Sequence, residues 1–100
     1  MTRNALKLSP QDNVASAIVP LKTGETAEIY YHDELLEQIP LVDDVPFGFK
    51  FAARDISKGE DILKYGVPMG VASADIRAGE MVHVHNVEGA RGRGDKGEAK

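Results

Sequence analysis

The chain has 100 residues, no cysteine and a formal net charge of −4 at pH 7, with 42% hydrophobic and 28% charged residues. These totals describe one ordinary globular domain and exclude disulfides, thiolate nucleophiles and cysteine metal sites. The acidic balance argues against nucleic acid as a main partner, because phosphate binding needs a basic surface. No segment has the length of a signal-peptide core or a membrane span, so we expect a cytoplasmic protein outside the membrane.

The elements predicted along the chain are those of an all-β domain. Short apolar runs are separated by glycine and proline, and no long window has apolar residues at helical spacing. The expected strands are 5–8, 14–19, 27–31, 48–54, 61–65, 70–72 and 81–86. One short helical turn is expected in "HDELLEQ", with Asp33 as its cap and Leu35, Leu36 and Ile39 on its buried side.

A six-residue pattern recurs between these strands. "DISKGE" at 55–60 and "DIRAGE" at 75–80 are two copies, and "PLKTGE" at 20–25 is a weaker third. The glycine of each copy suits the positive-φ position of a tight turn that leads into a new apolar run. So few copies cannot stack into a solenoid, so we interpret them as repeated turns within one compact β domain.

The last predicted strand, "MVHVHNV", carries the candidate site. Strand alternation directs Val82 and Val84 towards the core and His83 and His85 to the other face, about 7 Å apart at their origins. Two imidazoles placed in this way could bind one cation, and Asn86 is close enough to orient them. Two ligands do not complete a metal site, so surface or structural histidines are the alternative interpretation.

The final thirteen residues, "EGARGRGDKGEAK", contain four glycines and no large apolar side chain. Such a segment cannot bury enough surface to offset the entropy of ordering. We therefore expect a domain at 1–87 and a flexible tail at 88–100. A solvated terminus, a weak RNA-binding arginine–glycine segment and a segment that orders against a partner chain are the three interpretations of this tail.

An ordered set of motifs extends through the second half of the chain: Asp-Ile-x-x-Gly, Lys-Tyr-Gly, Ala-x-x-Asp-Ile-x-x-Gly-Glu and Val-His-x-His-Asn. In this order they resemble the SAF domain of the altronate/galactarate dehydratase family, which also includes the sulfolactate sulfo-lyases. The resemblance is close over 48–95, looser over the first 30 residues, and implies a β-clip fold. The matching positions are Asp55, Ile56, Gly59, Lys64, Tyr65, Gly66, Gly70, Ala72, Asp75, Ile76, Gly79, Glu80, Val82, His83, His85 and Asn86.

The resemblance also implies a function. The family carries out β-elimination from hydroxy acids, removing water from a sugar acid or sulfite from a sulfonated one. We expect the chain to be the small subunit of such a lyase, inactive alone, forming one wall of an active site shared with a large catalytic subunit. A divalent metal, Fe²⁺ or Mn²⁺, would be held mainly by the large subunit, with His83 and His85 as ligands or acid catalysts.

Other residues receive roles from the same resemblance. Lys50 and Asn86 are expected to bind the substrate, and Arg91 and Arg93 to bind the large subunit. The family usually has Gly-His-Lys where this chain has Gly-Phe-Lys, and Phe49 can neither ligate a metal nor transfer a proton. The alternative function is a stand-alone SAF module that binds a sugar acid or a partner protein without catalysis.

Overall fold

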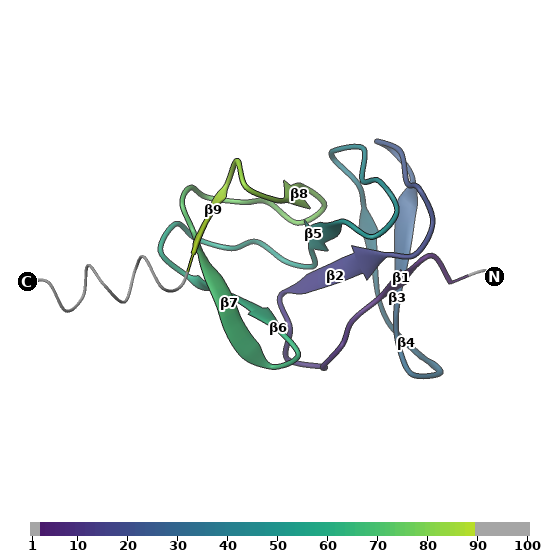
Figure 1. The fold of residues 1–100 in the computed structure, drawn as a ribbon. Coiled ribbons are helices and arrows are strands. Elements are labelled where there is room, and N and C mark those ends of the chain that lie inside the picture. The colour runs from purple at the N-terminus through teal and green to yellow at the C-terminus, as the bar shows by residue number, and fades with distance from the viewer. Residues whose placement is uncertain (1–2, 90–100) are drawn as a thin grey trace, which may run out of the picture.

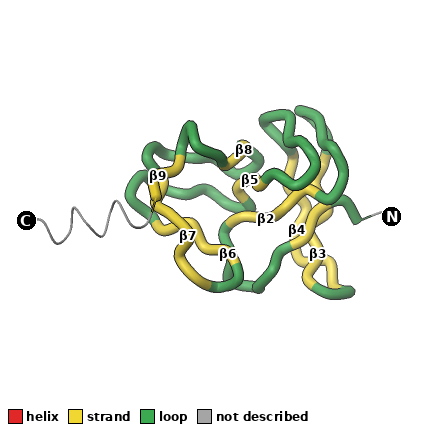
Figure 2. Tube along the Cα trace, viewed as in Figure 1, coloured by secondary structure: helices red, strands yellow, loops and turns green. Residues whose placement is uncertain are grey.

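The computed structural model describes residues 3–89, and this part of the chain contains nine β-strands and no helix (Figure 1). Loops and tight turns join the strands (Figure 2). The all-β class predicted from the sequence is therefore confirmed, and the described residues include no helix that could cross a membrane. The strands are β1 (Ala5–Leu6), β2 (Val14–Ala17), β3 (Thr26–Tyr31), β4 (Glu34–Pro40), β5 (Lys50–Ala52), β6 (Asp61–Lys64), β7 (Val67–Ala72), β8 (Met81–Val82) and β9 (Val87–Gly89).

The strands form two sheets. The larger has the order β4-β3-β1-β2-β5-β8, and the smaller has the order β6-β7-β9. Only the β1–β3 pair is parallel among the described strands. The β3–β4 hairpin and the β7–β9 sheet lie at opposite ends of the molecule (Figure 1). β9 includes Glu88 and Gly89, which the sequence analysis assigned to the tail, and the remainder of that tail lies outside the described residues.

The expected helical turn in "HDELLEQ" is wrong, because this segment forms most of β4. Ile29 of β3 pairs with Glu37 and Tyr30 pairs with Leu35, so Leu36 is an extra residue in a β-bulge. A bulge shifts strand alternation by one position, which produces adjacent apolar residues that resemble a helical face. Pairing with β3 decides the conformation of this segment.

Four tight turns of one kind join the strands, and the sequence pattern identified three of them. The fourth is "DVPFGF" at 44–49, which ends in phenylalanine instead of glutamate. Each turn places its glycine at a φ between 85° and 92°, a region in which only glycine avoids a steric penalty. These glycines are Gly24, Gly48, Gly59 and Gly79.

The turns pair two by two, 20–25 with 44–49 and 55–60 with 75–80. Leu21 and Val45 exchange two backbone hydrogen bonds of 2.9 Å at the centre of the first pair. Ile56 and Ile76 exchange two of 2.8 Å at the centre of the second. Each pair of turns is therefore a small antiparallel unit in which the central side chains point into the core.

Aspartates cap the turns across each pair. In the second pair, Asp55 and Asp75 each accept a backbone N–H of the opposite turn, at 3.0 and 2.9 Å. In the first pair, Asp44 accepts the N–H of Thr23 at 2.8 Å, but the reciprocal position is Pro20. The second pair of turns thus has two aspartate caps and the first pair has one.

The buried apolar side chains form two clusters, one around each pair of turns. β2 and β5 contribute to both, because successive side chains of a strand point to opposite faces. Ala15 and Phe51 lie in the first cluster, whereas Val14 and Ala52 lie in the second. These two strands are therefore the wall shared by the two halves of the core.

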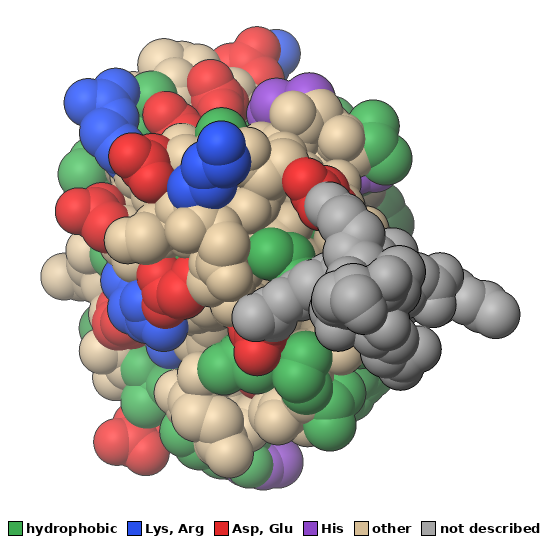
Figure 3. All heavy atoms as spheres, turned by 90° about the vertical axis from the view of Figure 1, so that its left-hand side faces the viewer, with side chains coloured by type: hydrophobic (Ala, Val, Ile, Leu, Met, Phe, Trp, Pro, Cys, Tyr) green, Lys and Arg blue, Asp and Glu red, His purple; other side chains and the backbone are tan. Residues whose placement is uncertain are grey.

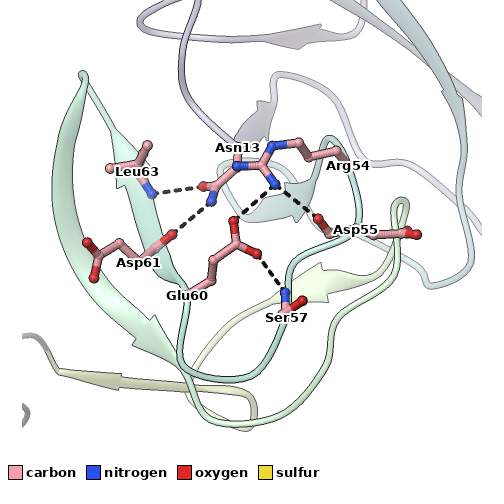
Figure 4. A network of polar contacts seen from close by, with 7 residues as sticks. All are labelled: Asn13, Arg54, Asp55, Ser57, Glu60, Asp61 and Leu63. Atoms are coloured by element: carbon pink, nitrogen blue, oxygen red, sulfur yellow. Dashed lines mark hydrogen bonds and ion pairs between the residues drawn. The ribbon is translucent and has the colours of Figure 1, made fainter.

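The side chains of two residues before β2 form hydrogen bonds with the backbone of β6 and of the β6–β7 turn. Asn13, which is fully buried, donates from Nδ2 to the carbonyl of Asp61 at 2.8 Å (Figure 4). Its Oδ1 accepts the N–H of Leu63, also at 2.8 Å. Asp12, 3% exposed, accepts two consecutive N–H groups of the β6–β7 turn at 3.0 and 2.8 Å. One short loop thus fixes both β6 and the tip of its hairpin.

The turn at 55–60 is closed by its own glutamate. Glu60 accepts the N–H of Ser57 at 2.7 Å and pairs with the guanidinium of Arg54 at 3.1 Å (Figure 4). The pKa of Glu60 is lowered, chiefly by the Ser57 N–H bond and also by Arg54. Glu25 and Glu80 make the same contact with backbone N–H groups in their own turns.

Candidate functional site

An open pocket of about 370 Å³ lies where β5, β6, β7 and the segment after β8 meet. Lys50, Lys64 and His83 supply its cationic or titratable donors, and Glu88 is the only carboxylate in the described lining. The other lining residues are Ile62, Met69, Val84, Val87 and Gly89. Two lysines and an imidazole on an apolar wall are suited to an anionic ligand that also has nonpolar surface.

Lys50 begins β5, where its backbone pairs with Val82 of β8, and its side chain is partly buried at the pocket. Burial lowers the pKa of the Lys50 ammonium group, and the nearby charge of Lys64 lowers it further. Both effects disfavour the charged form of Lys50. The negative charge of an anion in the pocket would oppose both effects, so binding a carboxylate would raise the pKa of Lys50 and favour its protonation.

The expected strand at 81–86 is correct only for its first two residues. β8 ends at Val82, and the next four residues form a turn closed by a 3.0 Å bond from the N–H of Asn86 to the carbonyl of His83. Val84 is 80% exposed, so its expected place in the core is wrong. Strand alternation therefore does not decide where His83 and His85 point.

The side chain of Asn86 explains this turn. Asn86 is 7% exposed, and its Oδ1 accepts the N–H of His83 at 2.9 Å. Its Nδ2 donates to the carbonyl of Met81, also at 2.9 Å. An asparagine that bonds to nearby backbone groups competes with strand pairing and favours a turn. Asn86 therefore holds the loop that carries both histidines.

The three histidines do not come together. His83 lines the pocket and packs against Phe49, with ring centroids 4.8 Å apart. His85 is exposed on the same turn but is not part of the lining. His32 lies at the tip of the β3–β4 hairpin. Within residues 3–89, no three histidine or carboxylate side chains gather to hold a metal ion.

A second pocket, of about 270 Å³, lies beside β1 and the tip of the β3–β4 hairpin. Its cationic groups already have partners. The buried Lys7 pairs with Glu37 at 2.9 Å, and the Arg3 guanidinium lies 4.6 Å from the centre of the Tyr30 ring. We therefore regard the first pocket as the candidate site.

The structure adds residues that the sequence analysis did not assign to a site. Lys64 was noted only as part of a family motif, although it lies with Lys50 in the pocket. Met69 is the extra residue of a bulge, because Ile62 pairs with Gly70 and the next β6 residue pairs with Pro68. A hairpin bulge has no strong sequence signal of its own. Arg91 and Arg93 lie outside the described residues.

Comparisons with known proteins agree with the motifs. Residues 3–90 match the altronate/galactarate dehydratase SAF domain. The chain is 43% identical to an altronate dehydratase of Escherichia coli (strain K12) over 81 residues, which are 81% of this chain and 15% of that protein. It is 37% identical to an altronate dehydratase of Bacillus subtilis (strain 168) over 86 residues, which are 86% of this chain and 16% of that protein.

A shorter relative also matches. The chain is 44% identical to the (2R)-sulfolactate sulfo-lyase subunit alpha of Chromohalobacter salexigens over 54 residues, which are 54% of this chain and 57% of that subunit. The chain thus spans about one sixth of the altronate dehydratases and more than half of the sulfo-lyase subunit.

Proposed function

Since the chain belongs to the altronate/galactarate dehydratase SAF-domain family, we propose that it is the accessory subunit of a hydroxy-acid dehydratase. In this proposal it forms one wall of an active site that it shares with a larger catalytic polypeptide. The substrate class is a sugar acid that loses water, because the two altronate dehydratases match more of this chain than the sulfo-lyase subunit does. The observation that carries the proposal is the pocket containing Lys50, Lys64 and His83.

The chemistry of β-elimination gives these residues their roles. When a base of the larger polypeptide removes the proton from the carbon beside the carboxylate, negative charge develops on the carboxylate oxygens. Lys50 and Lys64 stabilise that charge from one side of the pocket. In this proposal His83 donates a proton to the departing hydroxide, a contribution worth about 10² to 10⁴-fold in rate. Asn86 keeps His83 in place by holding the turn.

The metal is assigned mainly to the larger polypeptide. His83 and His85 supply at most two ligands, and the described residues contain no group of three that could complete a site. An Fe²⁺ or Mn²⁺ ion held at the interface would neutralise charge on the substrate carboxylate. In the same proposal, Arg91 and Arg93 contact the larger polypeptide, the complex is cytoplasmic, and neither nucleic acid nor membrane is a partner.

Reconstitution tests the proposal. The purified chain, the large lyase subunit encoded in the same genome and a mixture of the two are assayed for 2-oxo-3-deoxy acid formed from altronate or galactarate. Only the mixture is expected to turn over. Replacement of Lys50 by methionine keeps most of the side-chain volume but removes the charge, and is expected to reduce kcat/KM by about tenfold or more.

The control is Lys58→Met, at an exposed lysine in the turn at 55–60, which is expected to leave kcat/KM unchanged. Full turnover by the large subunit alone would exclude a shared active site. Full activity of both Lys50→Met and His83→Ala in the mixture would exclude this pocket.

A binding module without catalysis is the second candidate, and the two lysines of the pocket, which suit an anionic ligand, support it. Calorimetric titration of the isolated chain with altronate separates the two functions. Binding that is lost in Lys50→Met, together with no activity in any mixture, would support the binding module.

A further inference from the structure

The rim of the pocket is apolar and exposed. Met69 and Val84 line the pocket and are 54% and 80% exposed. Val67, 50% exposed, and Tyr65, 66% exposed, continue this surface to the tip of the β6–β7 hairpin. We call these four residues the apolar rim. On the end of the molecule that carries β7 and β9, Figure 3 shows a group of hydrophobic side chains in the lower part of the view, with most of the charged side chains above and to the left.

The backbone at the hairpin tip of the apolar rim is held in a fixed conformation. Tyr65 and Gly66 form the two-residue turn of the hairpin with φ values of 60° and 75°. Positive φ is uncommon for tyrosine and persists only where the surroundings enforce it. Here the buried Asp12 accepts the N–H groups of both turn residues, at 3.0 and 2.8 Å. An exposed aromatic side chain on a rigid turn loses little conformational entropy when it binds a partner.

We propose that the apolar rim is the surface on which the larger catalytic polypeptide docks, with Tyr65 as its anchor. This inference rests on the proposed function. The described lining has one carboxylate, Glu88, and the described residues contain no group of three metal ligands, so in the proposed function a second polypeptide supplies the remaining groups from outside the pocket. Any chain that closes the pocket from outside must contact Met69 and Val84. Tyrosine is among the residue types that contribute most binding energy in protein interfaces.

A second copy of this chain fits the rim poorly. In a two-fold dimer the same surface patch meets itself. Lys50 and Lys64 of both copies would then lie within one desolvated interface. Juxtaposed like charges oppose association, whereas carboxylates of a different polypeptide would complement them. The altronate dehydratases, in which the matched segment is 15% and 16% of the protein, have a much larger remainder for such an interface.

Binding measurements test the proposal with the full chain and the large lyase subunit encoded in the same genome. A carboxylate placed in the rim by Val67→Asp is expected to raise the Kd by about 30-fold or more, as is Tyr65→Ala. The matched control is Leu35→Asp on β4, the outer strand at the far side of the larger sheet, where the side chain is 38% exposed. The control is expected to change the Kd less than threefold, and circular dichroism verifies the folding of all three variants.

The outcomes separate this inference from the proposed function. If the unmodified chain binds the large subunit tightly and neither Val67→Asp nor Tyr65→Ala weakens that binding, the docking surface is overturned. The proposed function as an accessory subunit is then unaffected. No binding by the unmodified chain would overturn both. A free chain with the mass of a dimer, converted to a monomer by Val67→Asp, would assign the rim to a second copy instead.

Discussion

The described chain builds similar frameworks twice. β2, the β3–β4 hairpin and β5 form the first unit together with the turns at 20–25 and 44–49. β5, the β6–β7 hairpin and β8 form the second unit with the turns at 55–60 and 75–80. In both units, each turn forms two backbone hydrogen bonds with the residue that lies three positions before its partner turn. The N–H of the turn glycine donates to the carbonyl of that residue, and the carbonyl of the residue after the glycine accepts its N–H. Those four partner residues are Leu41, Ala17, Ala72 and Ala52.

The units differ in what surrounds this framework. β3 pairs with β1 as well as with β4, whereas the corresponding edge of β6 is bonded by the side chain of Asn13, and Asp12 bonds the β6–β7 turn. The pocket beside β1 contains Lys7, which Glu37 neutralises, while the pocket of the second unit places Lys50 near Lys64. Similar backbones therefore acquire different chemistry from a few charged side chains.

The turn glycines provide the sharpest test of this comparison. Gly48 and Gly79 occupy equivalent turns at φ values of 85° and 92°, but their surroundings differ. A Cβ on Gly79 would overlap the carbonyl oxygen of Pro40, whereas a Cβ on Gly48 would meet no atom within 4 Å. Gly48→Ala is expected to lower the free energy of unfolding by about 1 to 2 kcal/mol, the penalty of a positive φ. Gly79→Ala is expected to lower it by about 3 kcal/mol or more.

Urea unfolding of both variants measures the difference. An equal loss in the two variants would mean that the last turn of the second unit can move away from Pro40 without penalty. The same turn also bonds to the first unit, because the carbonyl of Gly79 accepts the N–H of Val42 at 3.0 Å. An equal loss would mean that these contacts do not join the two units rigidly.

The hairpin tips give the next largest expected effect. Asp12→Ala removes a buried carboxylate that accepts two N–H groups of the β6–β7 turn, and is expected to lower the free energy of unfolding by about 2 kcal/mol. Asp33 lies in the β3–β4 turn, fully exposed and 3.6 Å from Arg3. Asp33→Ala is expected to have no measurable effect, because exposed ion pairs contribute little. Thermal unfolding compares the two, and similar losses would contradict the distinction between the hairpins.

The sequence predicted the framework well because its signals are local. A glycine at a positive φ and an aspartate that caps a turn are recognisable in a six-residue window, so the turns at 55–60 and 75–80 were identified. The turn at 44–49 was missed because Phe49 replaces the glutamate of the pattern. Within β4, the bulge at Leu36 produced an apolar spacing that resembles a helix.

The candidate site was harder to predict because its parts are distant in sequence. The Val-His-x-His-Asn motif predicted a site at both His83 and His85. The hydrogen bonds of Asn86 hold these residues in a turn, and of the two histidines only His83 lines the pocket. Lys50 lies on β5 in the larger sheet and Lys64 on β6 in the smaller sheet. They line one pocket only because of the tertiary arrangement of the two sheets. The resemblance to the SAF domain is confirmed by the family match, whereas the catalytic roles of these residues stay predictions.

The smallest effect that we expect to be measurable concerns the aspartate caps of the turn pairs. The pKa of Asp44 is lowered, first by the N–H of Thr23 and then by its hydroxyl, which donates at 2.9 Å. The ionised carboxylate therefore stabilises the fold at any pH above the unfolded value of about 4, and this contribution is lost as the pH falls through the lower folded pKa. Asp44→Asn is expected to reduce the Tm slightly at pH 7, and the two melting curves should converge as the pH approaches about 2. A constant difference in Tm down to that pH would mean that the charge of Asp44 does not contribute to the stability of the first pair of turns.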